Sequence, residues 1–338
     1  MPTALVTGGA GFLGSHVADA LLAMGHRVVV LDDLSGGSRA NVPGGAEFVA
    51  GSVVDHDLID RLFAERRFDA VFHLAAYAAE GLSHFIKRFN YTTNLLGSIN
   101  LINAAVNAGT VQCFVFTSSI AVYGPGQVPM RESTTPQPVD PYGIAKYAVE
   151  LDLHEARHMF GLNFVVFRPH NVYGERQHIG DRYRNVIGIF MNQIVKGEPM
   201  TVFGDGEQRR AFTHVSDVAP LIARSIERPA VWNDVYNVGA DTPCTLNELA
   251  TAVAHAMGVP PRTVRLDPRN EVVHAFSDHT KTRAAFGDLI RGVSLAEGLA
   301  RTAAWVRGSG AGVTRASPAV EVTKNFPRAW LQDQGGGR

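Results

Sequence analysis

Cysteine, charge of one sign and long apolar runs are all scarce in this sequence. Its 338 residues contain two cysteines, which cannot build a disulfide framework and suit a reducing compartment. Lys and Arg (31) nearly balance Asp and Glu (32), and the formal net charge of −1 argues against nucleic acid or an acidic membrane as a partner. No run is long enough to span a bilayer and no secretory signal follows Met1, so we expect a cytoplasmic protein without a membrane segment.

What is present is the composition of an ordinary globular protein. Hydrophobic residues make up 46% of the chain and charged residues 19%, which argues against a disordered or fibrous protein. The length allows one large domain with a smaller one beside it.

A glycine-rich turn separates the first predicted strand from the first predicted helix. The first apolar run leads into Gly8, Gly11 and Gly14, after which apolar residues recur at helical spacing. A second apolar run ends in Asp32 and Asp33. Glycines let a pyrophosphate approach the helix N-terminus, and an acid after the second strand can bind a ribose diol. The pattern indicates dinucleotide binding, and NAD rather than NADP, because Asp32 would repel a 2′-phosphate.

Strands and helices alternate along the first half of the chain. This alternation predicts an α/β fold with a Rossmann-like, doubly wound parallel sheet that helices cover on both faces. Ligands bind at the carboxyl ends of such strands, where Gly8, Asp32, Ala75, Ser118 and Ser119 fall. Further strands are expected at 47–50, 70–74, 113–117 and 164–167, and helices at 55–66, at about 85–108 and around Tyr142.

A serine, a tyrosine and a lysine stand where this fold can bring them together. Tyr142 and Lys146 are four residues apart on a predicted helix, so both side chains share one face. Ser119 follows a predicted strand. A phenol beside a fixed cation loses its proton more easily, which makes Tyr142 a usable base.

Three groups of ionisable residues suggest other roles that the pattern does not favour. Asp55 and Asp57 open a predicted helix, where capping is expected rather than carboxylate chemistry. His73 closes an apolar strand and is expected to be a satisfied core or strand-end histidine. His154 and His158 match the H-E-x-x-H pattern, but no third ligand follows at a defensible spacing. We expect no metal site and predict solvated or subunit-interface histidines.

The elements become shorter and more polar after residue 168. We predict that a lobe over residues 169–307 faces the substrate and partly interleaves with a dinucleotide-binding domain over residues 1–168. Its expected elements are a hairpin-like polar loop at 204–210 and helices at about 185–195, 246–257 and 295–306.

An extension over residues 308–338 follows the lobe. It is rich in Gly, Ser and Ala at its start and in Gly at its end. Between them we expect a docking strand at 320–322 and an aromatic anchor that includes Trp330.

Several motifs follow one another along the chain. They are Gly8-x-x-Gly11-x-x-Gly14, Asp32, His73-Leu74-Ala75-Ala76, Ser118-Ser119 with Val122-Tyr123-Gly124, Tyr142-x-x-x-Lys146, and Arg168-Pro169-x-Asn171-Val172-Tyr173-Gly174. Together they resemble the extended short-chain dehydrogenase/reductase family over about residues 3–306, within it the NAD-dependent nucleotide-sugar epimerases and dehydratases, with the UDP-glucose 4-epimerase-like enzymes as the nearest group. The resemblance implies tightly held NAD, a lobe that binds a nucleoside-diphosphate sugar, and a homodimer built on the helices at about 92–108 and 142–160.

The resemblance also implies a role for individual residues. Ser119 would hydrogen-bond the sugar hydroxyl, Tyr142 would be the acid/base, and Lys146 would hold the nicotinamide ribose and lower the pKa of the tyrosine. The implied cofactor-binding residues are Gly8, Gly11, Phe12, Leu13, Asp32, Asp33, Ser52, Val53, Leu74, Ala75, Ala76, Asn94, Tyr142, Lys146 and His170. The implied substrate-binding residues are Ser119, Tyr142, Asn171, Asn185, Val186, Arg210 and Arg269.

The chain departs from the family pattern in ways that separate its members. Where the 4,6-dehydratases carry an Asp-Glu pair after the catalytic hydroxyl, this chain has Ile120 and Ala121. Without that acid and that base, an elimination reaction lacks its catalyst. Oxidation and reduction at one carbon remain possible, which predicts a 4-epimerase. The alternatives are an NAD-dependent nucleotide-sugar dehydrogenase or ketoreductase, a dehydratase, and a non-enzymatic NAD-binding scaffold.

Other departures concern the substrate. The segment 77–89 differs from the usual family sequence, and its His84, Lys87 and Arg88 either suit an anionic or enlarged sugar or belong to an exposed helix start. Arg210 is followed by Ala211, where relatives often carry Asp, and the acid after Arg269 stands one residue early.

Overall fold

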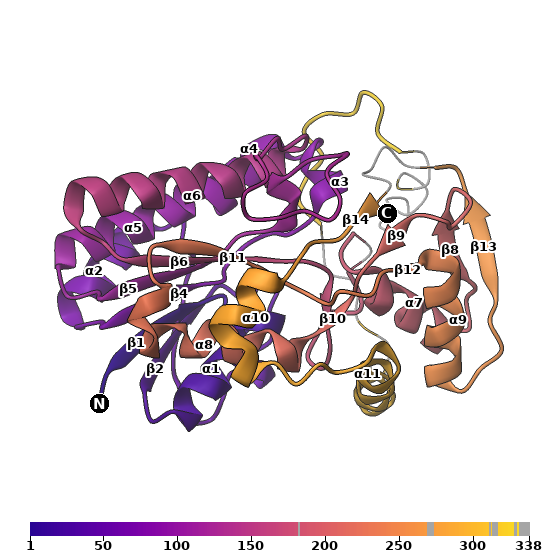
Figure 1. Ribbon diagram of the computed structural model, residues 1–338, viewed down its shortest axis with the longest axis horizontal. Helices are drawn as coiled ribbons and strands as arrows, with labels where there is room; N and C mark the ends of the chain where they lie inside the picture. Colours follow the sequence, from indigo (N-terminus) through magenta and orange to yellow (C-terminus); the bar gives the residue numbers. More distant parts are fainter. Residues whose placement is uncertain (182, 269–273, 311, 313–316, 328–329, 331–338) are drawn as a thin grey trace, which may run out of the picture.

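A parallel sheet forms the centre of the molecule (Figure 1). The structure, a computed structural model, describes residues 1–181, 183–268, 274–310, 312, 317–327 and 330. Strand order in the sheet is β11-β6-β5-β4-β1-β2-β3, and every neighbouring pair is parallel. This confirms the predicted doubly wound α/β sheet, and the order reverses at β1 and β4, where such sheets bind ligands. The strands are β1 (Thr3–Thr7), β2 (Arg27–Asp32), β3 (Glu47–Ala50), β4 (Ala70–His73), β5 (Cys113–Thr117), β6 (Phe164–Pro169) and β11 (Asp234–Val238).

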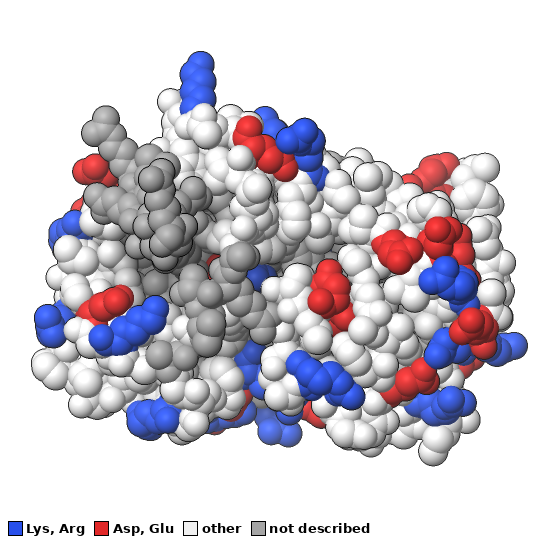
Figure 2. Space-filling model, turned by 180° about the vertical axis from the view of Figure 1, so that it is seen from behind, with Lys and Arg blue, Asp and Glu red and all other residues white. Residues whose placement is uncertain are grey.

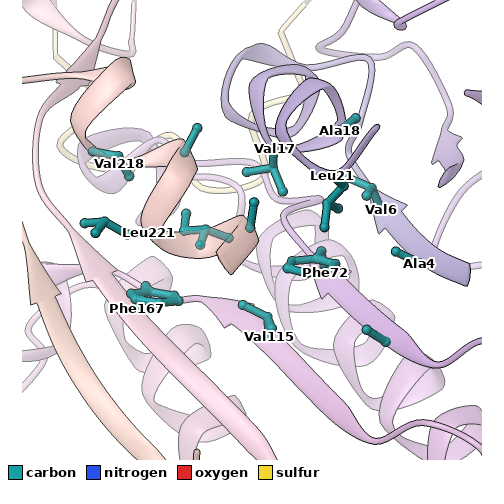
Figure 3. Packing of buried hydrophobic residues seen from close by; sticks show 14 of the residues in the cluster. Ala4, Val6, Val17, Ala18, Leu21, Phe72, Val115, Phe167, Val218 and Leu221 are labelled. Atoms are coloured by element: carbon teal, nitrogen blue, oxygen red, sulfur yellow. The ribbon is translucent and has the colours of Figure 1, made fainter. Parts of the chain in front are cut away.

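Helices cover both faces of the sheet. On one face Val17 and Leu21 of a helix pack with Phe72 and Phe167 of the strands, all fully buried (Figure 3). Burying a side chain of this size stabilises the fold by about 1.5–3 kcal/mol. The helices on this face are α1 (Phe12–Ala23), α8 (Ala219–Arg224) and α10 (Thr280–Phe286), and those on the other are α2 (His56–Glu65), α5 (Gly97–Ala108) and α6 (Pro141–Phe160).

Local signals set the ends of these helices. The Asp55 carboxylate accepts a hydrogen bond from Leu58 N and caps α2, as predicted. The Asp140 carboxylate caps α6, whose first residue is Pro141, and Gly161 ends it with a φ of +76°. Tyr142 therefore lies in the first turn of a well-defined helix.

The helix expected over about 85–108 is present, with a π-helical turn in its course. Helical residues continue without a gap from α4 (Lys87–Tyr91) through the π-helical turn η2 (Thr92–Leu96) into α5. Within that turn the Asn94 side chain bonds both backbone groups of Tyr77, a contact that the local pattern does not reveal. A separate short helix, α3 (Glu80–Ser83), precedes α4.

The second half of the chain builds a smaller lobe beside the sheet, on the right in Figure 1. It also supplies β11, so the sheet crosses the boundary predicted at residue 168, and the division into domains remains a prediction. The lobe contains β7 (Val172–Tyr173), β8 (Met200–Phe203), β9 (Arg209–Arg210), β10 (Thr213–His214), β12 (Cys244–Thr245), β13 (Thr263–Leu266), β14 (His274–Ala275), α7 (Val186–Val195), α9 (Leu246–Met257) and α11 (Leu295–Ser309).

Short 3-10 turns connect elements in both halves of the chain. Among the described residues they are η1 (Arg39–Asn41), η3 (Ile120–Val122), η4 (Val215–Asp217), η5 (Ser225–Glu227), η6 (Pro229–Val231) and η7 (Gly287–Leu289).

Two expectations for this half are wrong. The loop at 204–210 is not a hairpin, because β8 pairs with β13 while β9 pairs with β12 and β14. Residues 320–322 form no strand, and their attachment is described below. Among the described residues no helix combines the length and the apolarity that crossing a bilayer requires.

Candidate active site

The fold brings Ser119, Tyr142 and Lys146 together at the carboxyl ends of the strands. Ser119 follows β5, and the other two lie one turn apart at the start of α6. All three are nearly inaccessible, with 7%, 6% and 2% of their surface exposed. The Lys146 ammonium lies 5.8 Å from the centre of the Tyr142 ring and donates a hydrogen bond to the Thr117 carbonyl at 2.8 Å. The predicted cluster is therefore a real constellation.

Burial dominates the chemistry of Tyr142. Burial raises the pKa of the phenol above its usual value, and the charge of Glu80 raises it further. A hydrogen bond with Ser119 and the charge of Arg184 favour the phenolate. The net shift of this pKa is upward because burial outweighs the groups that favour the phenolate, and the expected effect of Lys146 on it remains a prediction. The ammonium is directed at a carbonyl, so Ser119 is the partner that eases proton loss.

A buried ion pair near Lys146 was not predicted from the sequence. Burial lowers the pKa of Lys146 to about 7, and the negative charge of Glu150 opposes that shift. Glu150, one turn further along α6, accepts hydrogen bonds from the Ser118 hydroxyl and, at 3.0 Å, from Nε of Arg168. An acid four residues after Lys146 on the same helical face was the signal that could have identified Glu150.

Another unpredicted contact comes from the segment 77–89. The Ser83 hydroxyl accepts a hydrogen bond from the amide of Tyr142 at 3.3 Å and donates one to the Glu80 carbonyl at 2.6 Å. Arg88 and Lys87 are exposed, as for a helix start, and the Arg88 side chain pairs with Glu321. Ser83 therefore contacts the backbone of Tyr142, and the charge of Glu80 acts on its phenol.

Hydrophobic residues occupy the positions where a dehydratase carries its acid and base. Ile120 and Ala121 lie in η3, which the Ser119 side chain caps by accepting from Ala121 N at 3.1 Å. Ile120 is buried, with 7% of its surface exposed. A Cβ on Gly143 would lie 2.6 Å from the Ala121 carbonyl, so this turn packs closely on the start of α6.

The glycine turn after β1 forms a cradle that side chains would fill. Gly8 adopts a φ of +70°, and a Cβ there would lie 2.7 Å from the amide nitrogen of Ala75. A Cβ on Gly14 would overlap the Gly8 carbonyl oxygen. Phe12 and Leu13 begin α1, and Gly11 at its N-cap has no side chain to cap the first amides, which fits a pyrophosphate.

Asp32 is placed to hold both a cofactor and its own loop. Its carboxylate accepts hydrogen bonds from Ala10 N at 3.0 Å and Leu34 N at 2.8 Å, which ties the glycine turn to the loop after β2. Asp33 is exposed and accepts from Ser35 N. The acid at the carboxyl end of β2 and the open helix N-terminus together fit NAD.

The other predicted cofactor residues lie along the same edge, with two qualifications. Ser52 and Val53 follow β3, while Leu74, Ala75 and Ala76 follow β4. Asn94 directs its amide to the Tyr77 backbone and to Asn90. His170 is buried against His279, with 3.0 Å between the two Nε2 atoms, and burial lowers its pKa to about 3. The side chains of Asn94 and His170 are thus engaged within the protein, and their cofactor roles remain predictions.

Three further predicted substrate residues, Asn171, Asn185 and Arg210, belong to the chain after β6. Asn171 donates to the Ala211 carbonyl at 3.0 Å, and Asn185 caps α7, which starts at Val186. Arg210 belongs to β9 and is partly exposed. Arg269 lies outside the described residues. No measured contact assigns these residues to a substrate, so their roles also remain predictions.

Two of the histidine expectations are confirmed. His73 is buried and its two ring nitrogens lie 2.8 Å from the Thr7 and Ser98 hydroxyls, so it is a satisfied core histidine. His154 and His158 are exposed on α6, as expected for solvated residues.

Comparison with known proteins gives the same picture as the geometry. Residues 4–239 match the model of the NAD dependent epimerase/dehydratase family. A UDP-glucose 4-epimerase of Mycolicibacterium smegmatis is 36% identical over 90% of this chain and 98% of its own. Two solved UDP-glucose 4-epimerases each match 91% of this chain and 99% of their own. The Thermotoga maritima enzyme, with UDP-glucose, has 36% identity and a TM-score of 0.86, and the Thermus thermophilus enzyme, with NAD, has 34% and 0.83. The chain belongs to the NAD-dependent epimerase/dehydratase family.

Proposed function

We propose that this protein is an NAD-dependent nucleotide-sugar 4-epimerase. The observation that carries the proposal is the complete Ser119, Tyr142 and Lys146 set beside Ile120 and Ala121. The site has a general acid/base and lacks a carboxylate at the two positions that elimination requires. Because the named relatives are UDP-glucose 4-epimerases, a UDP-hexose is the first substrate class to test.

The residues divide the proton chemistry among them. NAD, held by the glycine cradle and Asp32, would supply reversible hydride transfer at C4 of the sugar, so that the overall reaction would be redox-neutral. Tyr142 removes the 4-hydroxyl proton while that carbon is oxidised, and gives it back when the 4-keto sugar is reduced from its other face. Ser119 hydrogen-bonds Tyr142 and stabilises the phenolate against the effect of burial. Lys146, fixed by the Thr117 carbonyl, supplies a donor beside the ring.

Conversion of nucleotide sugars in solution tests the proposal. The protein is incubated with UDP-, GDP-, CDP- and dTDP-sugars, and inversion at C4 is followed by NMR. We expect inversion without net consumption of NAD. Loss of the 6-hydroxyl would instead identify a dehydratase, and stoichiometric use of the cofactor a dehydrogenase or ketoreductase. Failure with every sugar would contradict the proposal.

Tyr142→Phe tests the assignment of the acid/base. The variant keeps the ring and removes the hydroxyl, so turnover should fall by about 10²–10⁴-fold while NAD stays bound. Tyr147→Phe, on the same helix and partly buried, is the control and should turn over normally. Near-normal turnover by Tyr142→Phe would overturn the assignment.

We further propose a cytoplasmic homodimer. Ile144 and Leu151 on α6 and Leu96 before α5 are 42%, 53% and 51% exposed, and such apolar side chains on neighbouring helices support a helical interface between two copies. Lys, Arg, Asp and Glu are mixed over the face seen in Figure 2, which supports a small-molecule substrate rather than nucleic acid. Sedimentation of the purified protein as a monomer would contradict the dimer.

A further inference from the structure

The chain beyond α11 is attached to the segment 77–89. The amides of Glu321 and Val322 donate hydrogen bonds to the Phe85 carbonyl, at 2.7 and 3.2 Å. The Glu321 carboxylate in turn accepts from the amides of Arg88 and Phe89, at 2.8 and 3.0 Å. These amides lie in the first turn of α4, where an acid is favourable, so the attachment satisfies groups on both sides.

Aromatic residues extend this attachment. Phe326 and Trp330 are 8% and 6% exposed and pack with Leu82 and Ile86. Trp330 also meets the ring of Tyr183 edge to face, with 5.0 Å between ring centres. A Cβ on Gly81 would lie 3.5 Å from the Trp330 ring, so the indole rests directly on α3. Residues 320–327 and Trp330, which we call the strap, therefore join parts of the chain that are far apart in sequence.

The parts joined by the strap are those that surround Tyr142. Helix α3 carries Ser83, whose hydroxyl accepts from the Tyr142 amide, and Glu80, whose charge acts on the phenol. Arg184, next to Tyr183, is the positive group that acts on the same phenol, and its guanidinium lies 4.9 Å from the centre of the Tyr77 ring. Glu80 and Arg184, two groups of opposite charge that act on the phenol, thus stand on or next to residues that the strap contacts.

The matches leave part of this chain uncovered. They cover 98–99% of the relatives but 90–91% of this chain. The role of the strap is therefore argued from its own contacts.

We propose that the strap positions the segment 77–89 and Arg184 against Tyr142, with Glu321 and Trp330 as its positioning residues. The inference rests on the proposed function. Neither residue touches the reacting atoms, and they act through α3 and α4. The strap thus supports α3 and α4, while the glycine cradle is secured by the Asp32 carboxylate.

The proposal predicts how Trp330→Ala separates catalysis from cofactor binding. Loss of the indole frees α3 from its outer support, and a small displacement of a catalytic group has a large effect on rate. We expect kcat to fall about tenfold with unchanged NAD content, and Trp330→Phe to restore most of the loss. Lys324→Ala, at an exposed position of the strap, is the matched control and should behave as the wild type.

Hydrogen exchange gives a readout that does not depend on activity. In the full-length protein, Trp330→Ala should accelerate exchange across 77–89 and leave exchange around residues 8–14 unchanged. This result would stand even if the substrate were not a nucleotide sugar, so the two proposals can fail separately. Unchanged kcat together with unchanged exchange across 77–89 would overturn the strap.

A second variant tests the proposal in case Trp330→Ala does not fold. In that case Glu321→Gln carries the test, because it keeps the shape of the side chain and removes the charge that the amides of Arg88 and Phe89 and the Arg88 side chain receive. It should accelerate exchange in α4 and lower kcat about twofold to threefold with NAD content unchanged. A Glu321→Gln protein indistinguishable from the wild type in both measurements would then overturn the proposal.

Discussion

The proposed cofactor side and substrate side of the site are built in different ways. On the cofactor side, a short continuous stretch from Gly8 to Gly14 fixes its own backbone, and Asp32 secures it with two hydrogen bonds. On the substrate side, α3, α6 and the strap meet through side chains from distant parts of the chain. Changes on the first side should act through backbone geometry, and changes on the second through lost packing or lost charge pairing.

The largest effect on stability is expected for a substitution at Glu150, which supports both sides. Glu150→Ala leaves the Arg168 guanidinium buried without its carboxylate, which should lower the free energy of unfolding by about 3–5 kcal/mol. Urea unfolding measures the loss. Glu155→Ala, exposed on the same helix, is the control. A loss below about 1 kcal/mol would show that Arg168 finds other partners and that the pair supports neither side.

A smaller effect, confined to the cofactor side, is expected for Gly14→Ala. The new methyl group overlaps the Gly8 carbonyl oxygen, and relieving that contact should cost about 1–3 kcal/mol and release NAD. Cofactor content after gel filtration and thermal unfolding are the measurements. Gly44→Ala is the matched control, because a Cβ there meets no atom within 4 Å among the described residues. Retained NAD in Gly14→Ala would show that the cradle is less rigid than the comparison requires.

The smallest effect concerns the pH dependence of His73, at the end of β4 between the two sides. Burial, reinforced by the charge of Lys146, lowers the pKa of His73 to about 3 from an ordinary value of 6.5. Below pH 6.5 the unfolded chain therefore binds a proton that the folded protein does not, and stability falls as the pH falls towards 3. The contribution is about 1 kcal/mol between pH 6.5 and 5.5.

Unfolding midpoints measured across this pH range check the prediction. His73→Gln should flatten the dependence on pH, although His170, whose pKa is lowered for the same reason, continues to contribute. His158→Gln, on the exposed face of α6, is the control. An unchanged slope for His73→Gln would contradict the assignment.

The same contrast explains what could be predicted from the sequence. The glycine turn, the cap at Asp55 and the spacing of Tyr142 and Lys146 are local patterns, and the structure contains each of them. The hydrogen bonds of Glu321 in the strap could not be predicted, because their partner amides are up to 233 residues away in the sequence. The upward pKa shift of Tyr142 was missed because burial depends on the whole fold and not on its neighbours in sequence.

Strand β11 comes late in the sequence, which affects how the sheet forms during synthesis of the chain. This strand, at residues 234–238, pairs with β6, and Asn237 accepts a hydrogen bond from the Tyr123 hydroxyl at 2.7 Å. Until those residues leave the ribosome, β6 is an unpaired edge of nearly continuous hydrophobic sequence, the kind of edge that invites association with other chains. The sheet that carries the active site can therefore be completed only after two thirds of the protein has been synthesised.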